Sequence, residues 1–105
     1  MHLKIHPDPE EELFHGAAWY DDRRVGLGED FLSHVYRWLE VIGQSPSSWP
    51  RWPGTPEDLV PPIRRALLER FPFAVGYQAF ADYVLILTVA HCRRTPLYWL
   101  QRLDH

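Results

Sequence analysis

The sequence predicts an α+β protein in which an N-terminal strand and an α-helical hairpin pack on an antiparallel β-sheet, followed by a short C-terminal helix. Two observations lead to this prediction. Up to residue 43 the apolar residues recur mainly at helical spacing. From residue 63 onward they form three strand-length runs separated by short turns. The stretch between them holds six prolines over residues 45–62, which cannot sustain a helix or a central strand.

The first predicted element is a short strand over residues 3–6, where apolar and polar residues alternate. A helix should follow, with Asp8 as its N-cap and Pro9 as its first helical residue, since both residue types are favoured there. Glutamates at residues 10–12 suit the positive end of this helix. We expect it to end near Arg24.

A second apolar stripe predicts another helix, with Gly43 as its C-terminal stop; the stripe consists of Phe31, Val35, Trp38, Leu39 and Ile42. The segment Gly26-Leu27-Gly28 is interpreted as the turn between the helices, because no strand precedes it as a dinucleotide site requires. Since this connection is short, the two helices should form an antiparallel hairpin.

The C-terminal half should contain a three-stranded antiparallel meander, reached through an ordered surface loop over residues 45–62 that its tryptophans pin in place. The last strand is almost wholly apolar, which suits a central position with one face under the helical hairpin. A short helix over residues 97–103 is expected to pack against the sheet edge. The predicted strands are Ile63–Arg70, Phe73–Phe80 and Tyr83–His91.

Composition narrows the class of protein. The chain has 105 residues, 46% of them hydrophobic, so we expect one domain over residues 1–105. No apolar run approaches about 20 residues and the N-terminus does not resemble a secretory signal, which favours a cytoplasmic protein without membrane contact. Cys92 is the only cysteine, and there is no helical His-x-x-x-His pair. We therefore expect no metal and no cofactor.

The charge is unevenly distributed along the chain. The overall net charge of −3 combines −6 over residues 1–62 with +3 over residues 63–105. All basic residues of the second part are arginines, whose planar guanidinium groups bind phosphates and carboxylates well. This pattern favours an anionic partner at the C-terminal third, whereas the overall acidity argues against a broad, nonspecific nucleic-acid surface.

Residues from about Pro9 to Arg102 carry a resemblance to a known family. They are Trp19-Tyr20, Gly26 to Leu32, Arg64-Arg65, Arg70 to Phe73, Val75, Tyr77, Ala90-His91, Arg93-Arg94, Pro96, Tyr98-Trp99 and Arg102. In this order they resemble the RelE/ParE superfamily of type II toxins, which includes plasmid stabilisation proteins. The resemblance implies a small bacterial toxin of the cytoplasm, silenced in a toxin–antitoxin hetero-oligomer by the C-terminal segment of a cognate antitoxin. The Pro-rich loop has no counterpart in it.

The superfamily divides by target. ParE-like members poison DNA gyrase without a known hydrolytic activity, whereas RelE-like members are ribosome-dependent mRNA endonucleases. RelE-like nucleases are as a rule rich in lysine, and Lys4 is the only lysine of this chain. The low lysine content and the net acidity therefore favour a ParE-like toxin. An mRNA endonuclease and a non-toxic binding module of the same fold remain as alternatives.

The C-terminal third supplies candidate site residues for both branches. For a nuclease, acid–base chemistry, phosphate binding and base stacking would fall to His91, Arg65, Arg94 and Tyr98. For binding of target or antitoxin, the candidates are Arg64, Arg93, Trp99 and Arg102. Neighbours on a strand point to opposite faces, so at most one of Arg64 and Arg65 shares a site with His91. Structural roles compete with these: His91 can bond to backbone, and Trp99 can seal the sheet edge.

Overall fold

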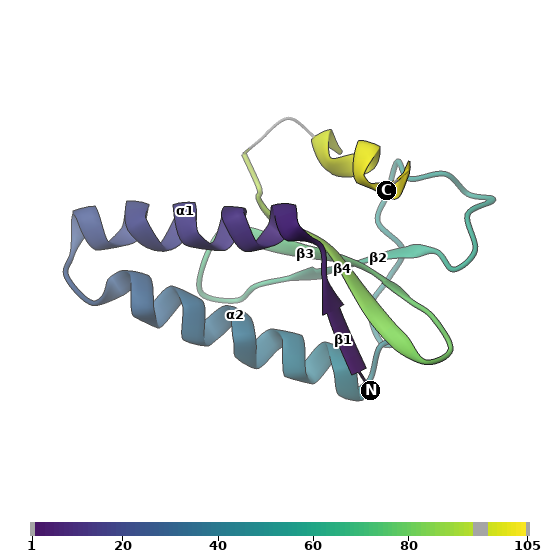
Figure 1. Cartoon of the computed structure of the whole chain (residues 1–105), viewed down its shortest axis with the longest axis horizontal. Coiled ribbons are helices and arrows are strands. Elements are labelled where there is room, and N and C mark those ends of the chain that lie inside the picture. The colour runs from purple at the N-terminus through teal and green to yellow at the C-terminus, as the bar shows by residue number, and fades with distance from the viewer. Residues whose placement is uncertain (1, 94–96, 105) are drawn as a thin grey trace.

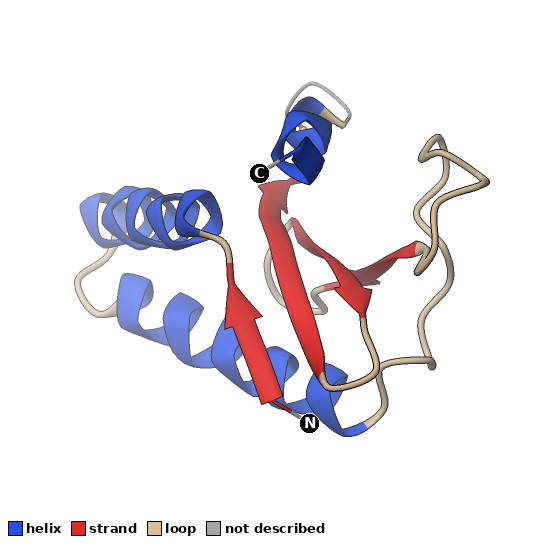
Figure 2. Ribbon diagram, turned by 45° about the vertical axis from the view of Figure 1, so that its right-hand side comes forward, coloured by secondary structure: helices blue, strands red, loops and turns tan. Residues whose placement is uncertain are grey.

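The structure, a computed structural model, describes residues 2–93 and 97–104. Figures 1 and 2 show a helical hairpin on one side of a four-stranded sheet, with the long loop and the C-terminal helix away from it. The predicted α+β class is confirmed. The elements in chain order are β1 (His2–Ile5), α1 (Pro7–Arg23), α2 (Leu27–Gln44), β2 (Ile63–Leu67), β3 (Phe73–Ala79), β4 (Tyr83–His91) and the 3-10 helix η1 (Tyr98–Asp104).

The sheet has the strand order β1-β4-β3-β2. The three C-terminal strands form the predicted antiparallel meander, with β2 ending earlier than expected, at Leu67. β1 pairs in parallel with β4, from Leu3 opposite Val84 to Ile5 opposite Ile86, so the whole sheet is mixed. β4 is central, as its apolar composition predicted, and both of its faces are covered.

Each face of the sheet has its own core. The helix face is packed by α1 and α2, and its fully buried side chains include Phe31, Val35, Val75 and Ile86. The opposite face, called here the second face, holds a smaller cluster of Ile63, Leu87, Ala90 and Trp99. Partly buried Trp52 and Leu59 of the Pro-rich loop pack against that cluster, so the loop covers the second face.

A bulge in β4 changes which side chains reach the helix face. Tyr77 lies opposite Ile86, whereas Gly76 lies opposite Thr88, so Leu87 is an extra residue without a partner in β3. A bulge shifts the alternation of side chains by one position. Both Ile86 and Val89 consequently face the helices, although an unbroken strand would put them on opposite faces.

The N-terminus of α1 differs from its prediction. The helix begins at Pro7, and the N-cap is His6, whose Nδ1 accepts a hydrogen bond from the Asp8 backbone N–H at 3.2 Å. The prediction that Asp8 caps the helix was wrong, because Asp8 lies inside the first turn. Its carboxylate is instead 3.3 Å from Arg102 Nε. The end of α1 at Arg23 agrees with the prediction.

The start of α2 is set by two glycines. Gly26 takes a φ of 90° as the N-cap, a backbone conformation that glycine adopts without strain. A Cβ on Gly28 would collide with the Ala17 carbonyl oxygen, so the helices approach closely at this point. The helix therefore begins at Leu27, so Leu27 and Gly28 belong to its first turn and only Gly26 of the predicted interhelical turn precedes it.

The end of α2 also corrects a prediction. Gly43 does not stop the helix; it is buried within the last turn, and α2 ends at Gln44. The Pro-rich loop that follows is ordered, and its tryptophans do anchor it: Trp49 lies 6.0 Å from Trp38, and Trp52 lies 4.8 Å from Trp99, between ring centroids. The loop is thus attached to both cores.

The C-terminal helix is a 3-10 helix over residues 98–104. A short helix was predicted here: Trp99 packs on the second face with Leu87 and Ala90, and Arg102 reaches the β4 backbone at the Leu87 carbonyl oxygen. Among the described residues, no helix combines the length and apolar character needed to cross a lipid bilayer.

Candidate functional site

The second face brings together three of the four residues predicted for nuclease chemistry. Arg65, His91 and Tyr98 all line a pocket of about 180 Å³. The fourth candidate, Arg94, lies outside the described residues. Arg64 is not among the lining residues, which agrees with the expectation that only one of the two neighbouring arginines shares a site with His91. Other lining side chains include Trp52, Cys92 and Trp99.

The polar groups near this pocket already have partners within the protein. The Arg65 guanidinium lies 5.6 Å from the Trp52 ring centroid. His91 Nδ1 accepts a hydrogen bond from the Arg93 backbone N–H at 3.0 Å, and the ring lies edge-on to Phe73. Arg64 turns the other way and donates to the Trp49 carbonyl oxygen at 2.7 Å. These contacts stabilise the loop and the strand ends, and they orient His91.

Two predicted binding residues lie in the interior. Trp99 is 1% exposed and packs on Trp52, while Arg102 is 7% exposed. In this structure neither side chain presents a surface to a partner. Arg93 is exposed, so it is the binding candidate at the end of β4 that a partner can reach. The assignment of these residues to a binding surface otherwise stays a prediction.

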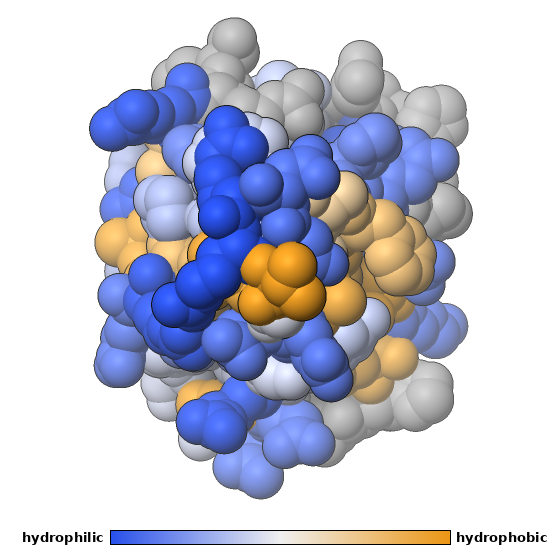
Figure 3. Space-filling view, turned by 90° about the vertical axis from the view of Figure 1, so that its left-hand side faces the viewer, coloured by the Kyte–Doolittle hydropathy of each residue, from blue (hydrophilic) through white to orange (hydrophobic). Residues whose placement is uncertain are grey.

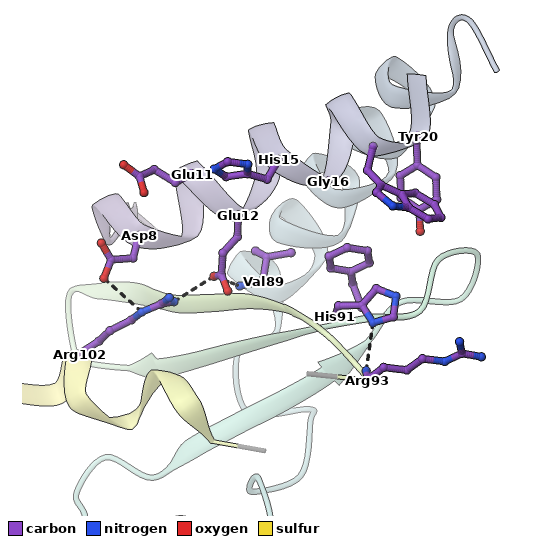
Figure 4. A pocket seen from close by; sticks show the side chains of 12 residues that line it. Asp8, Glu11, Glu12, His15, Gly16, Tyr20, Val89, His91, Arg93 and Arg102 are labelled. Atoms are coloured by element: carbon purple, nitrogen blue, oxygen red, sulfur yellow. Dashed lines mark hydrogen bonds and ion pairs between the residues drawn. The ribbon is translucent and has the colours of Figure 1, made fainter. Parts of the chain in front are cut away.

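A buried ion pair between Glu12 and Arg102 was missed by the sequence reasoning. Glu12 Oε1 accepts hydrogen bonds from Arg102 Nη1 at 2.9 Å and from the Val89 backbone N–H at 3.1 Å. It also accepts one from Thr88 Oγ1 at 3.1 Å. Arg102 Nη1 donates to the Leu87 carbonyl oxygen at 2.8 Å. The two side chains therefore bind both each other and the β4 backbone (Figure 4).

This ion pair lies beside the part of β4 that extends beyond the end of β1. β1 ends at Ile5 opposite Ile86, and the described part of the chain provides no further strand on that side of β4. The Leu87 carbonyl and the Val89 N–H would otherwise be left on an open strand edge, which is costly when buried. The two side chains replace the missing strand. They lie 90 residues apart, so no local sequence pattern reports them.

A larger groove runs between α1 and the end of β4 (Figure 4). Its volume is about 680 Å³, within the range typical of ligand pockets. Carboxylates gather where α1 begins, aromatic rings lie further along α1 and on β3, and basic groups lie at the end of β4. The lining residues are Asp8, Glu11, Glu12, His15, Gly16, Trp19, Tyr20, Phe73, Val89, His91, Arg93 and Arg102.

Two tyrosines have altered proton affinities. Burial raises the pKa of Tyr77 to about 12, although the nearby Arg64 guanidinium acts in the opposite direction. The Tyr77 hydroxyl donates to the Pro46 carbonyl oxygen at 2.6 Å, so it ties β3 to the start of the Pro-rich loop. Burial also raises the pKa of Tyr20, which lines the groove. Burial therefore moves the ionisation of both phenols further above neutral pH.

The tip of the helical hairpin carries a hydrophobic spot surrounded by hydrophilic surface (Figure 3). Val25, between α1 and α2, is 95% exposed. Single exposed apolar residues are common on protein surfaces, so this one alone does not define a site. Within residues 2–93 and 97–104, no three His, Cys, Asp or Glu side chains are grouped so that they could hold a metal ion.

The fold agrees with the one that the sequence resemblance implied, and it is shared with a solved structure. A chain from a solved structure of the "Chromosomal ParDE TA system from P. aeruginosa" shares it with a TM-score of 0.72, covering 87% of this chain and 95% of that chain. The two sequences are 18% identical, so the likeness concerns the fold. No protein-family model and no curated protein matches the sequence.

Proposed function

We propose that this protein is the toxin of a type II toxin–antitoxin system, acting in the cytoplasm and neutralised by a cognate antitoxin. The observation that carries the proposal is the fold shared with a chain of a ParDE system over 87% of this sequence. The resemblance noted in the sequence supports the same class independently of that fold. Within this class the chain acts as a ParE-like toxin that binds a target such as DNA gyrase.

The second face supports the choice of the ParE-like branch. Trp52 and Trp99 fill this face and leave about 180 Å³, below the roughly 300 Å³ at which ligand pockets usually begin. A nucleotide of a cleaved mRNA would need these side chains to move. Protein contact requires no such opening.

One observation favours the mRNA endonuclease as a second candidate. Arg65, His91 and Tyr98 come from three different elements and still line one pocket. This grouping provides a cation, an imidazole and a phenol, which suit phosphate binding and proton transfer. If the tryptophans moved apart, the pocket would have the groups that RNA cleavage needs.

Controlled expression in bacteria separates the two branches. We expect thymidine incorporation to stop before amino-acid incorporation, with linearised chromosomal DNA, and co-expression of the neighbouring small open reading frame to restore growth. Immediate translation arrest with cut mRNA would contradict the ParE-like proposal. Unimpaired growth would contradict both toxin branches and favour the non-toxic binding module.

Variants test the predicted nuclease residues directly. On the ParE-like proposal, Arg65→Ala, His91→Ala and Arg94→Ala should keep the DNA phenotype, and none should alter mRNA. The matched control is Arg37→Ala, an exposed arginine of α2 far from the pocket in sequence. Loss of mRNA cleavage in the first three variants, with cleavage kept in the control, would establish the endonuclease.

A further inference from the structure

The outer side of the helical hairpin carries two large aromatic side chains in contact with water. Phe14 of α1 is 65% exposed, and Tyr36 of α2 is 48% exposed. Figures 1 and 2 show this side turned away from the sheet, and no other element of the described chain lies over it. Neither ring is among the residues that line the groove along α1 or the pocket of the second face. Phenylalanine is among the residues most often buried, so these two rings mark a surface distinct from both spaces.

Helix geometry brings the two rings onto one patch. The antiparallel helices approach each other closely at Ala17 and Gly28. Phe14 lies three residues before Ala17, and Leu32 lies four residues after Gly28, so both follow the seam between the helices. Tyr36 lies one further turn along α2, while Leu32 is partly buried against the core. Phe14, Leu32 and Tyr36 together are called here the hairpin patch.

The hairpin patch has exposed carboxylates beside it. Glu10 lies four residues before Phe14, and Glu40 lies four residues after Tyr36, so each is on the same helix face as its aromatic neighbour. Neither carboxylate has an ion pair within the parts of the chain that the structure describes. Residues 7–44 as a whole contain nine Asp and Glu against three Arg. The patch is therefore an apolar centre with a negatively charged rim.

The charge of this rim decides which class of partner fits. A second copy of the chain would bring its own Glu10 and Glu40 close to the same carboxylates, which like-charge repulsion opposes. The phosphates of a nucleic acid are repelled for the same reason. An apolar centre with a polar rim is the usual anatomy of an interface between proteins. The matching partner is a protein surface whose apolar side chains are surrounded by Lys or Arg.

We propose that the hairpin patch binds the toxin's target protein, with apolar side chains of the target over Phe14 and Tyr36 and basic side chains beside Glu10 and Glu40. The inference rests on the proposed function, which names DNA gyrase as such a target. An enzyme that acts on DNA binds the phosphates with Lys and Arg, so it carries basic surface of the kind that this rim attracts.

Replacement of each ring tests the apolar centre. Purified DNA gyrase is titrated with the wild-type chain, Phe14→Gln and Tyr36→Gln, since glutamine is a good helix former. We expect each variant to raise the Kd for gyrase about tenfold, as the loss of an aromatic anchor does in other interfaces. The matched control is Val41→Gln, which should change the Kd by less than about twofold. Val41 is 39% exposed and lies five residues after Tyr36, on the other flank of α2.

Neutralisation of the rim tests the charge. The double variant Glu10→Gln with Glu40→Gln should raise the Kd about threefold at low salt and much less at high salt, because salt screens interactions between exposed charges. The control is Asp82→Asn in the exposed turn between β3 and β4, which should keep the Kd within about twofold at either salt concentration. A double variant that matches the wild type at low salt would overturn the charge matching from which the partner was inferred.

The antitoxin separates this inference from the proposed function. The purified product of the neighbouring small open reading frame should bind Phe14→Gln and Tyr36→Gln as tightly as the wild type, although these variants inhibit growth less. If the ring variants bind gyrase as the wild type does, the patch assignment is wrong and the function stands. If the wild-type chain does not bind gyrase, the proposed function fails and the inference with it. Variants that lose only the antitoxin, or self-association that Phe14→Gln abolishes, would assign the patch to another partner and overturn the proposal.

Discussion

The two faces of the sheet are covered in different ways. On the helix face, two regular helices bury Phe31 and Val35 against the strands. On the second face, an irregular loop and a short 3-10 helix deliver single large side chains, Trp52 and Trp99. Regular helices can be predicted from periodicity, whereas an irregular cover depends on a few anchors. The packing of the second face therefore depends more on single side chains than the packing of the helix face does.

The faces also differ in the space they leave for a partner. The second face keeps about 180 Å³ around Arg65 and Tyr98. At the margin of the helix face, the groove along α1 keeps about 680 Å³. Sequence reasoning placed the chemistry on the C-terminal strands, whereas the larger open space lies between those strands and α1. His91 lines both spaces, so it is the residue at which the two regions meet.

The largest loss of stability is expected when one large buried side chain is removed from either face. Phe31→Ala and Trp99→Ala should each lower the free energy of unfolding by about 3–5 kcal/mol, because both side chains are fully buried. Hydrogen exchange should distinguish them. Phe31→Ala should speed exchange throughout the sheet, whereas Trp99→Ala should speed it mainly in residues 50–65 and 98–104. Equal acceleration across the chain in both variants would show that the faces unfold as one unit.

The next largest effect is expected at the Glu12–Arg102 ion pair, which links α1, β4 and η1. Arg102→Ala leaves the Glu12 carboxylate and the Leu87 carbonyl buried without the guanidinium. We expect a loss of about 3 kcal/mol, the lower end for a broken buried pair, because the side chains keep 8% and 9% exposure. The matched control is Arg24→Ala, whose 3.9 Å pair with Asp30 is exposed on both sides and should contribute about 0–1 kcal/mol. Chemical denaturation measures both, and similar losses would refute the special role of the buried pair.

A smaller effect depends on pH and involves the loop attachment at Tyr77. Burial raises the pKa of this phenol from 10.0 to about 12, so between these values the native state keeps a proton that the unfolded chain releases. The associated stability is complete below pH 10 and is lost as the pH rises from 10 to 12. Tyr77→Phe should remove this part of the alkaline destabilisation and cost about 1 kcal/mol at neutral pH through the lost hydrogen bond to Pro46. An unchanged alkaline slope in thermal melts would contradict this.

The smallest effect is expected at the hairpin tip. Val25→Ser should change the free energy of unfolding by less than about 0.5 kcal/mol, because the side chain is 95% exposed and belongs to neither face. A larger loss in a denaturant titration would mean that the tip contributes to the packing of the hairpin.

Particular residues show why some features were predictable. The repeated apolar positions of α2 and the apolar run of β4 are local patterns, and both elements were predicted in the right place. The helix ends were less predictable, because competing contacts decided them: Asp8 pairs with Arg102 while His6 caps α1. Among the candidate residues, the opposite orientations of Arg64 and Arg65 followed from strand geometry. The burial of Arg102 did not, since its partner Glu12 is 90 residues away.

The sequence by itself determined the class of fold, the helical hairpin, the three antiparallel strands and the resemblance to RelE/ParE toxins. These depend on periodicity and turn residues, which act over a few positions. Only the tertiary structure decided the parallel pairing of β1, the Glu12–Arg102 pair at the open edge of β4, and the groove that it borders. Those features arise where distant segments meet and must satisfy each other's buried polar groups, and no short stretch of sequence contains that information.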